Sequence, residues 1–220
     1  MKIWCYFKRS LSIITDLLYP RHCAVCGKTI LGTKKIALCL KCEKKPLKTK
    51  VVRDDKFFFD EAVSAVSYKG KAREAMINYK FKSVKYYSEA YACLIDMAVG
   101  DRMDFRNAIM CPVPLSKGRK RVYNQTAVIA EKLSKEWDAV YIPDLMYKCR
   151  EVDQLSKMRL PERKFYIKDS LDVNPQYDIY NKDIVVIDDI YTSGTTANEC
   201  ARTLKMYGAA RVFVLCACYD

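Results

Sequence analysis

The sequence predicts an α/β protein with a doubly wound, mostly parallel sheet and a small cysteine-rich module near its amino terminus. Three observations support this prediction. Two C-x-x-C pairs lie within residues 23–42, apolar strand-like segments alternate with amphipathic helix-like segments after residue 55, and the run IVVI occupies residues 184–187. A run of this kind is typical of a central parallel strand that helices cover on both faces. With 220 residues, the chain can form one main core and a small appendage.

Composition restricts the partners and the compartment. The formal net charge of +13 indicates an anionic partner, which is nucleic acid, a phosphate-rich metabolite or an acidic protein surface. The 11 cysteines are odd in number and follow no secretion signal, so we expect a reducing, cytoplasmic environment. The apolar run near the amino terminus is broken by Asp16 and is too short to span a membrane. We expect no stable membrane insertion, and an amphipathic helix that docks on the protein itself through Leu11, Ile14, Leu17 and Leu18.

The segment CAVCGKTILGTKKIALCLKC, residues 23–42, carries one C-x-x-C pair at each end. Each pair forms a tight turn with converging thiolates, and two pairs complete the closed tetrahedral site of a structural Zn²⁺. The predicted ligands are Cys23, Cys26, Cys39 and Cys42, and the alternative is four buried cysteines without a metal. His22 is expected to be a neighbour, because four thiolates suffice. We assign the amino-terminal helix and this module to residues 1–50 and the main domain to residues 55–220, with a charged link between them.

The main domain alternates predicted strands and helices. EAVSAVSYKG is a strand that ends at Gly70, and the helix after it places Ala72, Ala75, Met76 and Tyr79 on one face. A helix over 88–99, a strand over 107–114, a helix over 124–137, the strand IVVIDDI, a helix over 195–207 and the strand RVFVLCACY follow. Residues 141–183 are less regular and are expected to form a flap or hood. Loops 68–71, 115–124 and 188–196 follow strands, so they should meet at one edge of the sheet.

The segment IVVIDDIYTSGTT, residues 184–196, combines an apolar strand, two acids and a loop suited to an anion. Backbone N–H groups at a helix start suit a phosphate monoester, and the predicted loop residues are Thr192, Ser193, Gly194, Thr195 and Thr196. Asp188 and Asp189 would repel a phosphate, so we expect them to accept hydrogen bonds from sugar hydroxyls. They can share one ligand only if the strand turns there, because successive strand residues point to opposite faces. The alternative is an acidic strand end with Thr192 or Ser193 as an ordinary helix cap.

This segment resembles the 5-phosphoribosyl-1-pyrophosphate (PRPP) motif of type I phosphoribosyltransferases. The order of an apolar helix, two cysteine pairs, YKGKAREAMINYKFK, CPVPLSKGRKRVYNQ, DQLSKMRLPERKFY and this motif is similar to the ComF family of competence-associated proteins. The resemblance implies a type I phosphoribosyltransferase-like fold, with ribose hydroxyls at the two aspartates and the 5-phosphate at 192–196. It also implies a pyrophosphate loop at Tyr68, Lys69 and Gly70. The family usually has glycine where this chain has Val122, and Gln154, Arg159 and Arg163 match recurring positions without a legible role.

The basic segment SKGRKRVYNQ, residues 116–125, leaves three interpretations open. Its cations could offset the charge of a leaving pyrophosphate, and the catalytic candidates are then Lys69, Arg119, Lys120 and Arg121. The loop could instead hold nucleic-acid phosphates while an aromatic ring stacks on a base, with the candidates Lys117, Arg119, Lys120, Arg121, Tyr123 and Asn124. The third interpretation is a solvated loop without a ligand.

Two functions follow from the resemblance. The first is a ComF-like protein of DNA uptake that binds PRPP with Mg²⁺, contacts single-stranded DNA and works with a helicase-like competence ATPase. The second is an active phosphoribosyltransferase with an unknown nitrogen acceptor, acting in nucleotide metabolism without a DNA role. Whether any group is transferred stays open at this point, because nothing in the sequence identifies the nucleophile.

Overall fold

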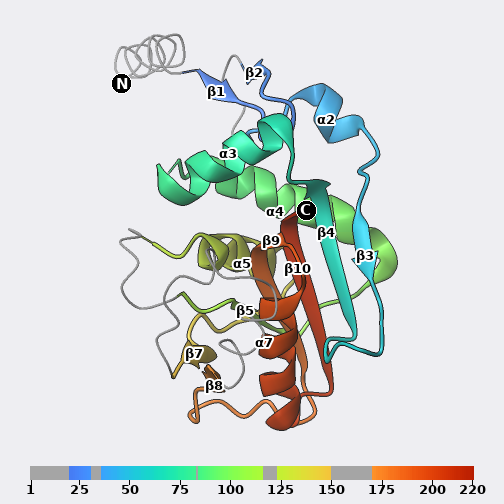
Figure 1. Ribbon diagram of the computed structural model, residues 1–220, viewed down its shortest axis with the longest axis vertical. Coiled ribbons are helices and arrows are strands. Elements are labelled where there is room, and N and C mark those ends of the chain that lie inside the picture. The colour runs from blue at the N-terminus through green and yellow to red at the C-terminus, as the bar shows by residue number, and fades with distance from the viewer. Residues whose placement is uncertain (1–19, 31–35, 83, 116–122, 150–169) are drawn as a thin grey trace, which may run out of the picture.

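The computed structural model describes residues 20–30, 36–82, 84–115, 123–149 and 170–220. Its centre is a six-stranded sheet in the order β3-β4-β10-β9-β5-β6 (Figure 1). The parallel strands are β4 (Glu61–Ser67), β10 (Arg211–Tyr219), β9 (Asp183–Tyr191), β5 (Ile109–Pro112) and β6 (Val140–Tyr141). At one edge, β3 (Lys50–Val52) pairs antiparallel with β4. The predicted mostly parallel α/β sheet is confirmed.

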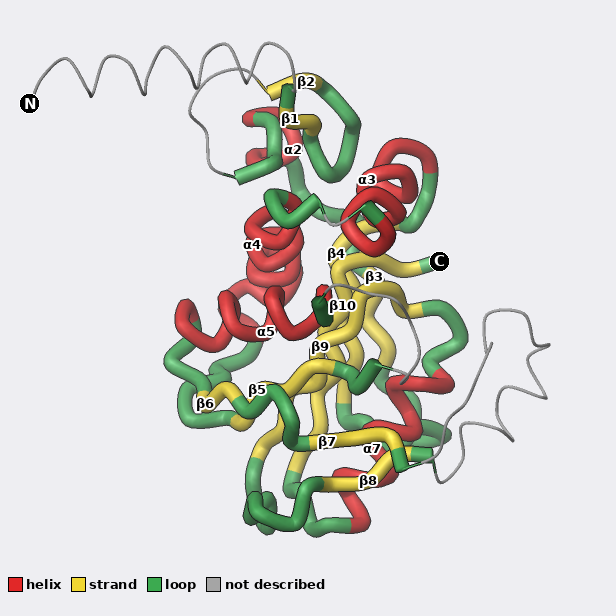
Figure 2. Tube along the Cα trace, turned by 90° about the vertical axis from the view of Figure 1, so that its left-hand side faces the viewer, coloured by secondary structure: helices red, strands yellow, loops and turns green. Residues whose placement is uncertain are grey.

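Helices cover both faces of this sheet. α4 (Tyr87–Val99) and α5 (Gln125–Glu136) pack on one face, α7 (Thr195–Met206) packs on the other, and α3 (Gly70–Phe81) packs against α4 (Figures 1 and 2). A short 3-10 helix, Gly100–Arg102, follows α4. The four residues predicted for the inner face of α3 are all buried. Two clusters of buried side chains result, one on each side of the sheet, which is the doubly wound arrangement.

β9 shows why the sequence forms this sheet. Ile184, Val185, Val186 and Ile187 are all fully buried, and β9 lies between β10 and β5. Alternate residues of the strand point to opposite faces. Val185 and Ile187 therefore belong to the cluster under α4 and α5, whereas Ile184 and Val186 belong to the cluster under α7. Full burial of one such side chain contributes about 1.5–3 kcal/mol, so this run stabilises both layers.

The amino-terminal module contains β1 (Arg21–His22), β2 (Thr29–Ile30) and α2 (Leu40–Lys44). Its buried residues Ala24 and Leu38 belong to the same cluster as Tyr87 and Tyr91 of α4. The module therefore packs on the main domain through a shared core. The helix predicted through Leu11 to Leu18 lies outside the described residues.

β4 ends at Ser67, short of the predicted Gly70, because Gly70 already begins α3. Within the predicted hood, β7 (Met146–Lys148) and β8 (Leu171–Val173) form an antiparallel pair, and β8 contacts α7. Residues 150–169 of the predicted hood are outside the described part.

In the stretches of chain that the structure describes, no helix combines the length and apolar character needed to cross a membrane.

Candidate functional site

The turns after β4, β5 and β9 lie at one edge of the sheet, because these strands are parallel. Backbone bonds link the strand ends to one another. The N–H of Tyr68 donates to the carbonyl of Tyr219 at 2.6 Å, and the N–H of Val113 donates to the carbonyl of Ile187 at 3.0 Å. This carboxyl edge is the usual place for a ligand in an open α/β sheet.

The alternation of side chains along β9 slips at the two aspartates. Ile187 and Ile190 both pack with the cluster under α4 and α5, although they are three positions apart. Val186 and Tyr191 both pack with the cluster under α7, although they are five positions apart. A regular strand would place the members of each pair on opposite faces. The strand therefore turns at residues 188–190, which is the condition under which two adjacent aspartates can face one ligand.

The carboxylates of Asp188 and Asp189 have different partners. The N–H of Asp189 donates to Oδ1 of Asp188 at 2.7 Å. Burial and the charge of Asp189 raise the pKa of Asp188 to about 7, while this hydrogen bond, Lys80 and Lys148 oppose the rise. Asp189 forms an ion pair with Lys80, with Oδ2 and Nζ 2.7 Å apart and each side chain 14% exposed. At neutral pH the strand end thus presents closely coupled acceptors with a cation beside them.

The loop after β9 ends in a helix start that no side chain caps. Gly194 is the N-cap residue of α7 and has φ of +75°. It has no side chain that could accept a hydrogen bond from the first N–H groups of the helix. The hydroxyls of Ser193 and Thr195 are hydrogen-bonded at 2.8 Å, and Thr192 is exposed. The alternative interpretation required Thr192 or Ser193 as the helix cap. The cap is Gly194, so that alternative is wrong. A glycine cap leaves the first backbone N–H groups of α7 to water or an anion.

The turn after β4 carries the three residues predicted for a pyrophosphate loop. Lys69 is exposed, is the N-cap residue of α3 and makes no side-chain cap bond. Gly70 has φ of +50°, and a β-carbon there would meet no atom within 4 Å. The guanidinium of Arg73 lies over the ring of Tyr68, 5.8 Å from its centroid. Lys69 also lines a groove of about 260 Å³, together with Lys45 of the amino-terminal module.

Two candidate ligand contacts of the predicted basic loop, Tyr123 and Asn124, are described, and both contact the protein itself. Tyr123 is half-buried, and its ring lies against Tyr79 with centroids 6.3 Å apart. Burial raises the pKa of Tyr123. Asn124 is the N-cap residue of α5, where its Oδ1 accepts from the N–H of Thr126 at 3.1 Å. The predicted residues outside the described part are Lys117, Arg119, Lys120, Arg121, Gln154, Arg159 and Arg163.

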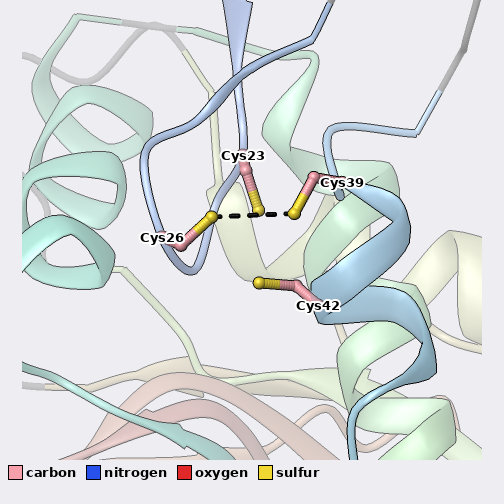
Figure 3. Close-up of side chains that lie close together, drawn as sticks. All are labelled: Cys23, Cys26, Cys39 and Cys42. Atoms are coloured by element: carbon pink, nitrogen blue, oxygen red, sulfur yellow. Dashed lines mark hydrogen bonds between the residues drawn. The ribbon is translucent and has the colours of Figure 1, made fainter.

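The four predicted cysteines form one cluster (Figure 3). The N–H of Gly27 donates to the carbonyl of Cys23 at 3.0 Å, and the N–H of Cys42 donates to that of Cys39 at 2.9 Å, so each pair sits on a tight turn. All four sulfur atoms lie within 4.8 Å of one another, and Sγ of Cys26 and Cys39 are 3.6 Å apart. Four thiolates about 2.3 Å from a zinc ion would be about 3.8 Å apart, so the cluster fits this ion.

Within the cluster, the electrostatics favour ionisation of one thiol. Burial acts to raise the pKa of Cys39, but a backbone hydrogen bond from Cys42 and the neighbouring thiols lower it to about 7, whereas burial raises the pKa of Cys26 and Cys42. A thiol that ionises near neutral pH is a ready metal ligand. His22 is exposed and does not belong to the four-residue cluster, as predicted.

Three residues near this edge were not predicted as part of the site. Lys80 lies in the last turn of α3 and reaches Asp189. The side chain of Gln125 is buried, and its Nε2 donates to the carbonyl of Lys80 at 3.0 Å. Tyr79 donates its hydroxyl to the carbonyl of Gln125 at 2.8 Å. A lysine in a last helical turn is common, because it complements the helix dipole, so its position gave no functional signal.

Comparison with known proteins yields a distant relative and weak structural similarities. No family model matches the chain. Competence protein F of Haemophilus influenzae is 26% identical over 145 residues, which are 62% of this chain and 62% of that protein. The chain thus spans less than two thirds of the relative that it matches.

Two solved structures illustrate the structural similarity. Phosphoribosylpyrophosphate synthetase of Mycobacterium smegmatis has a TM-score of 0.37 and 15% identity over 58% of this chain and 33% of that one. A hypoxanthine phosphoribosyltransferase of Staphylococcus aureus has a TM-score of 0.36 and 16% identity over 61% and 62%. At such TM-scores, the fold assignment depends on the strand order described above.

Proposed function

Because the chain is a distant homologue of competence protein F, we propose that it is a ComF-like protein of DNA uptake whose main domain binds PRPP with Mg²⁺. The observation that carries the proposal is the slip of β9 at Asp188 and Asp189, directly before a helix that only a glycine caps. Hydrogen-bond acceptors and donors thereby lie next to each other. The carboxylates can accept from the ribose hydroxyls, and the backbone N–H groups can donate to the 5-phosphate.

The phosphate would lie at Thr192 to Thr196. Gly194 lets the backbone approach the anion, and the hydroxyls of Ser193 and Thr195 are already close to each other. This loop contains no lysine, so its attraction for phosphate would come from N–H groups and the helix dipole.

The diphosphate of PRPP would lie toward the turn of Tyr68, Lys69 and Gly70. Lys69 is exposed and makes no side-chain cap bond, so its charge is available to an anion. Bound Mg²⁺ would come with the diphosphate and would neutralise part of its charge. Arg119, Lys120 and Arg121 would approach the same group from the loop before α5.

Single-stranded DNA is the proposed second ligand. The net charge of +13 favours an anionic polymer, and the residues proposed to contact it are Lys117, Arg119, Lys120, Arg121, Tyr123 and Asn124. Tyr123 and Asn124 already contact the protein, so DNA would engage the exposed part of the tyrosine and the basic residues before it. A helicase-like ATPase of DNA uptake is the proposed protein partner.

The cysteine cluster is proposed to hold one structural Zn²⁺. The fit of the four sulfur atoms to a tetrahedral ion supports this proposal. Four thiolates leave no open position on the metal, so the ion would stabilise the module and take no part in chemistry.

Transfer of the phosphoribosyl group is the second candidate function, and the exposed Lys69 beside the carboxyl edge favours it. A nitrogen nucleophile would attack C1 of the ribose, the bond from C1 to the diphosphate oxygen would break, and pyrophosphate would leave with the bonding electrons. Cations near the diphosphate would stabilise its charge in the transition state. Pyrophosphate release across a panel of nucleobases, amines and single-stranded DNA would test this candidate, and one active acceptor would establish it.

PRPP binding is tested by thermal unfolding and calorimetry with PRPP and Mg²⁺. We expect a rise in Tm that grows with ligand concentration and disappears when Asp188→Asn and Asp189→Asn are combined. Asp101→Asn, an exposed carboxylate elsewhere, is the matched control and should keep the rise. The absence of any rise in the unmodified protein would refute PRPP binding.

DNA binding is tested by its dependence on salt. We expect affinity for single-stranded DNA to fall steeply with ionic strength, and to fall less steeply when Arg119, Lys120 and Arg121 are replaced by serine. Replacement of Lys135 and Lys182, which are exposed lysines, controls for loss of charge alone. Binding that is absent or independent of salt would remove the DNA proposal.

A further inference from the structure

Lys80 lies at the strand-end carboxylates but belongs to none of the loops that carry the proposed ligand contacts. We propose that Lys80 is a positioning residue of the ribose phosphate site, which pairs with Asp189 and holds this carboxylate in place to accept a hydrogen bond from a ribose hydroxyl. The inference rests on the proposed binding of PRPP. It adds a residue whose action passes through Asp189 and not through contact with the ligand.

The ion pair between Lys80 and Asp189 differs in exposure from the ion pair that lies along the same helix. Nζ of Lys80 lies 2.7 Å from Oδ2 of Asp189, and both side chains are 14% exposed. In contrast, the pair between Lys71 and Glu74 is about 60% exposed on each side. An exposed ion pair contributes little to folding stability. In a pair withdrawn from water, the attraction only roughly offsets the lost hydration. The position of Lys80 is therefore poorly explained by stability and better explained by its effect on the carboxylate of Asp189.

Two hydrogen bonds, one partly buried and one buried, connect the backbone of Lys80 to the start of α5. Nε2 of Gln125 donates to the carbonyl of Lys80 at 3.0 Å, and the hydroxyl of Tyr79 donates to the carbonyl of Gln125 at 2.8 Å. Both residues are at most 1% exposed. The end of α3 is thus fixed against the start of α5. A lysine fixed in this way can hold a partner in place better than an exposed lysine with free rotamers.

The cation matters because two adjacent carboxylates do not ionise independently. The charge of Asp189 raises the pKa of Asp188 and Lys80 lowers it, so without this cation Asp188 would keep its proton to higher pH. The other titratable groups that interact with this pair are Tyr79 of α3, Lys148 of β7, Cys200 of α7, and Cys216 and Cys218 of β10.

These neighbours do not replace Lys80. Burial raises the pKa of the tyrosine and of the three thiols, to about 12 for Cys218, so all four are neutral at pH 7. The cations that lower the pKa of Asp188 are Lys80 and Lys148, and Lys80 has the larger effect. Removal of Lys80 should therefore leave Asp188 protonated over a wider pH range.

The decisive comparison is PRPP binding, in the presence of Mg²⁺, by the unmodified protein and Lys80→Gln between pH 6 and pH 9. At pH 7 we expect roughly a 10- to 100-fold loss of affinity in the variant, the size of a charge-assisted hydrogen bond. The loss should shrink as the pH rises, because Asp188 then loses its proton in the variant as well. A loss of equal size at every pH, or no loss, would overturn the inference.

Conservative and matched variants make the comparison specific. Lys80→Arg keeps the charge and should keep the affinity and its pH profile close to those of the unmodified protein. Lys82→Gln removes an exposed lysine from the end of the same helix and should change neither. If Lys82→Gln reproduces the behaviour of Lys80→Gln, general charge would explain the effect, and the inference would be wrong.

Two further measurements keep the inference separate from PRPP binding and from folding. In the free protein, the carbon-13 carboxyl signal of Asp188 should titrate at higher pH in Lys80→Gln, and an unchanged titration would refute the inference even if PRPP does not bind. If Lys80→Gln does not fold, the double variant Lys80→Gln/Asp189→Asn removes both charges and avoids an unpaired one. Its affinity should equal that of Asp189→Asn alone, and a further loss would show that Lys80 does not act through Asp189.

Discussion

The hydroxyl of Tyr191 occupies the space in which Gly194 would carry a β-carbon. An added β-carbon would lie 2.5 Å from this oxygen, and Gly194 has φ of +75°. Tyr191 is buried in the cluster under α7, so it cannot swing freely into solvent. The proposed phosphate loop is therefore fixed by the last residue of β9, and the identity of Gly194 follows from both its conformation and its neighbour.

We expect Gly194→Ala to destabilise the protein by about 2–4 kcal/mol. A left-handed conformation costs a residue with a β-carbon about 1–2 kcal/mol, and displacement of the tyrosine adds to this. Gly70→Ala is the matched control for stability, because Gly70 also has positive φ but its β-carbon would meet no atom within 4 Å. Urea unfolding of both variants measures the difference. Equal losses would show that Tyr191 imposes no steric limit.

Two buried tyrosines on neighbouring helices should respond in opposite ways to removal of the hydroxyl. Tyr79 and Tyr91 are both fully buried, with ring centroids 5.3 Å apart. Tyr79 donates to the carbonyl of Gln125, so Tyr79→Phe leaves a buried carbonyl without this donor and should cost about 1–3 kcal/mol. The hydroxyl of Tyr91 has no hydrogen-bond partner among the described residues, so Tyr91→Phe should be neutral or stabilising. Chemical unfolding of the two variants would contradict this account if Tyr91→Phe were the more damaging change.

The sequence predicted the parts of this fold that depend on local patterns. The buried face of α3 follows from helical spacing, and the burial of Ile184 to Ile187 follows from an uninterrupted apolar run. The four-cysteine cluster follows from its doubled spacing, because two tight turns bring the thiols together wherever the module packs. These features need few contacts between segments that are far apart in the chain.

The features that were not predicted depend on such distant contacts. Lys80 and Asp189 are more than a hundred positions apart, and only the crossing of α3 over the end of β9 brings them together. The slip in β9 likewise becomes visible only when Ile190 and Tyr191 are assigned to their clusters. The shared core of module and main domain has the same origin, because the pattern of Ala24 and Leu38 does not show which helix will cover them.

Removal of zinc should destabilise more than the amino-terminal module. Cys23 and Cys42 are buried in the same cluster as Tyr91 of α4, so loss of the module exposes part of the main core. We expect one zinc ion per chain by elemental analysis, and a lowered Tm for the whole protein after treatment with a chelator. Calorimetry should show a single transition that shifts as a unit.

Cys39→Ser tests the same point without a chelator. We expect it to lose the metal and to lower Tm, whereas Cys149→Ser, which changes an exposed cysteine outside the cluster, should do neither. Full stability after complete loss of zinc would show that the cluster is not a structural metal site. A separate low-temperature transition for the module would contradict the shared core.

The stability of the protein should depend on the protonation of Asp188. Burial and the charge of Asp189 raise the pKa of Asp188 to about 7 in the folded state, compared with about 4 in an unfolded chain. Between these values the folded state binds more protons than the unfolded state, so this group lowers the free energy of unfolding as the pH rises from about 4 to about 7. Asp188→Asn removes the effect, so its stability relative to the unmodified protein should increase through this window, by on the order of 1–3 kcal/mol, and level off above it.

Asp101→Asn, at an exposed position, controls for loss of one negative charge. Urea unfolding at several pH values measures both variants, and an Asp188→Asn difference that is constant from pH 4 to pH 8 would show that this carboxyl ionises normally.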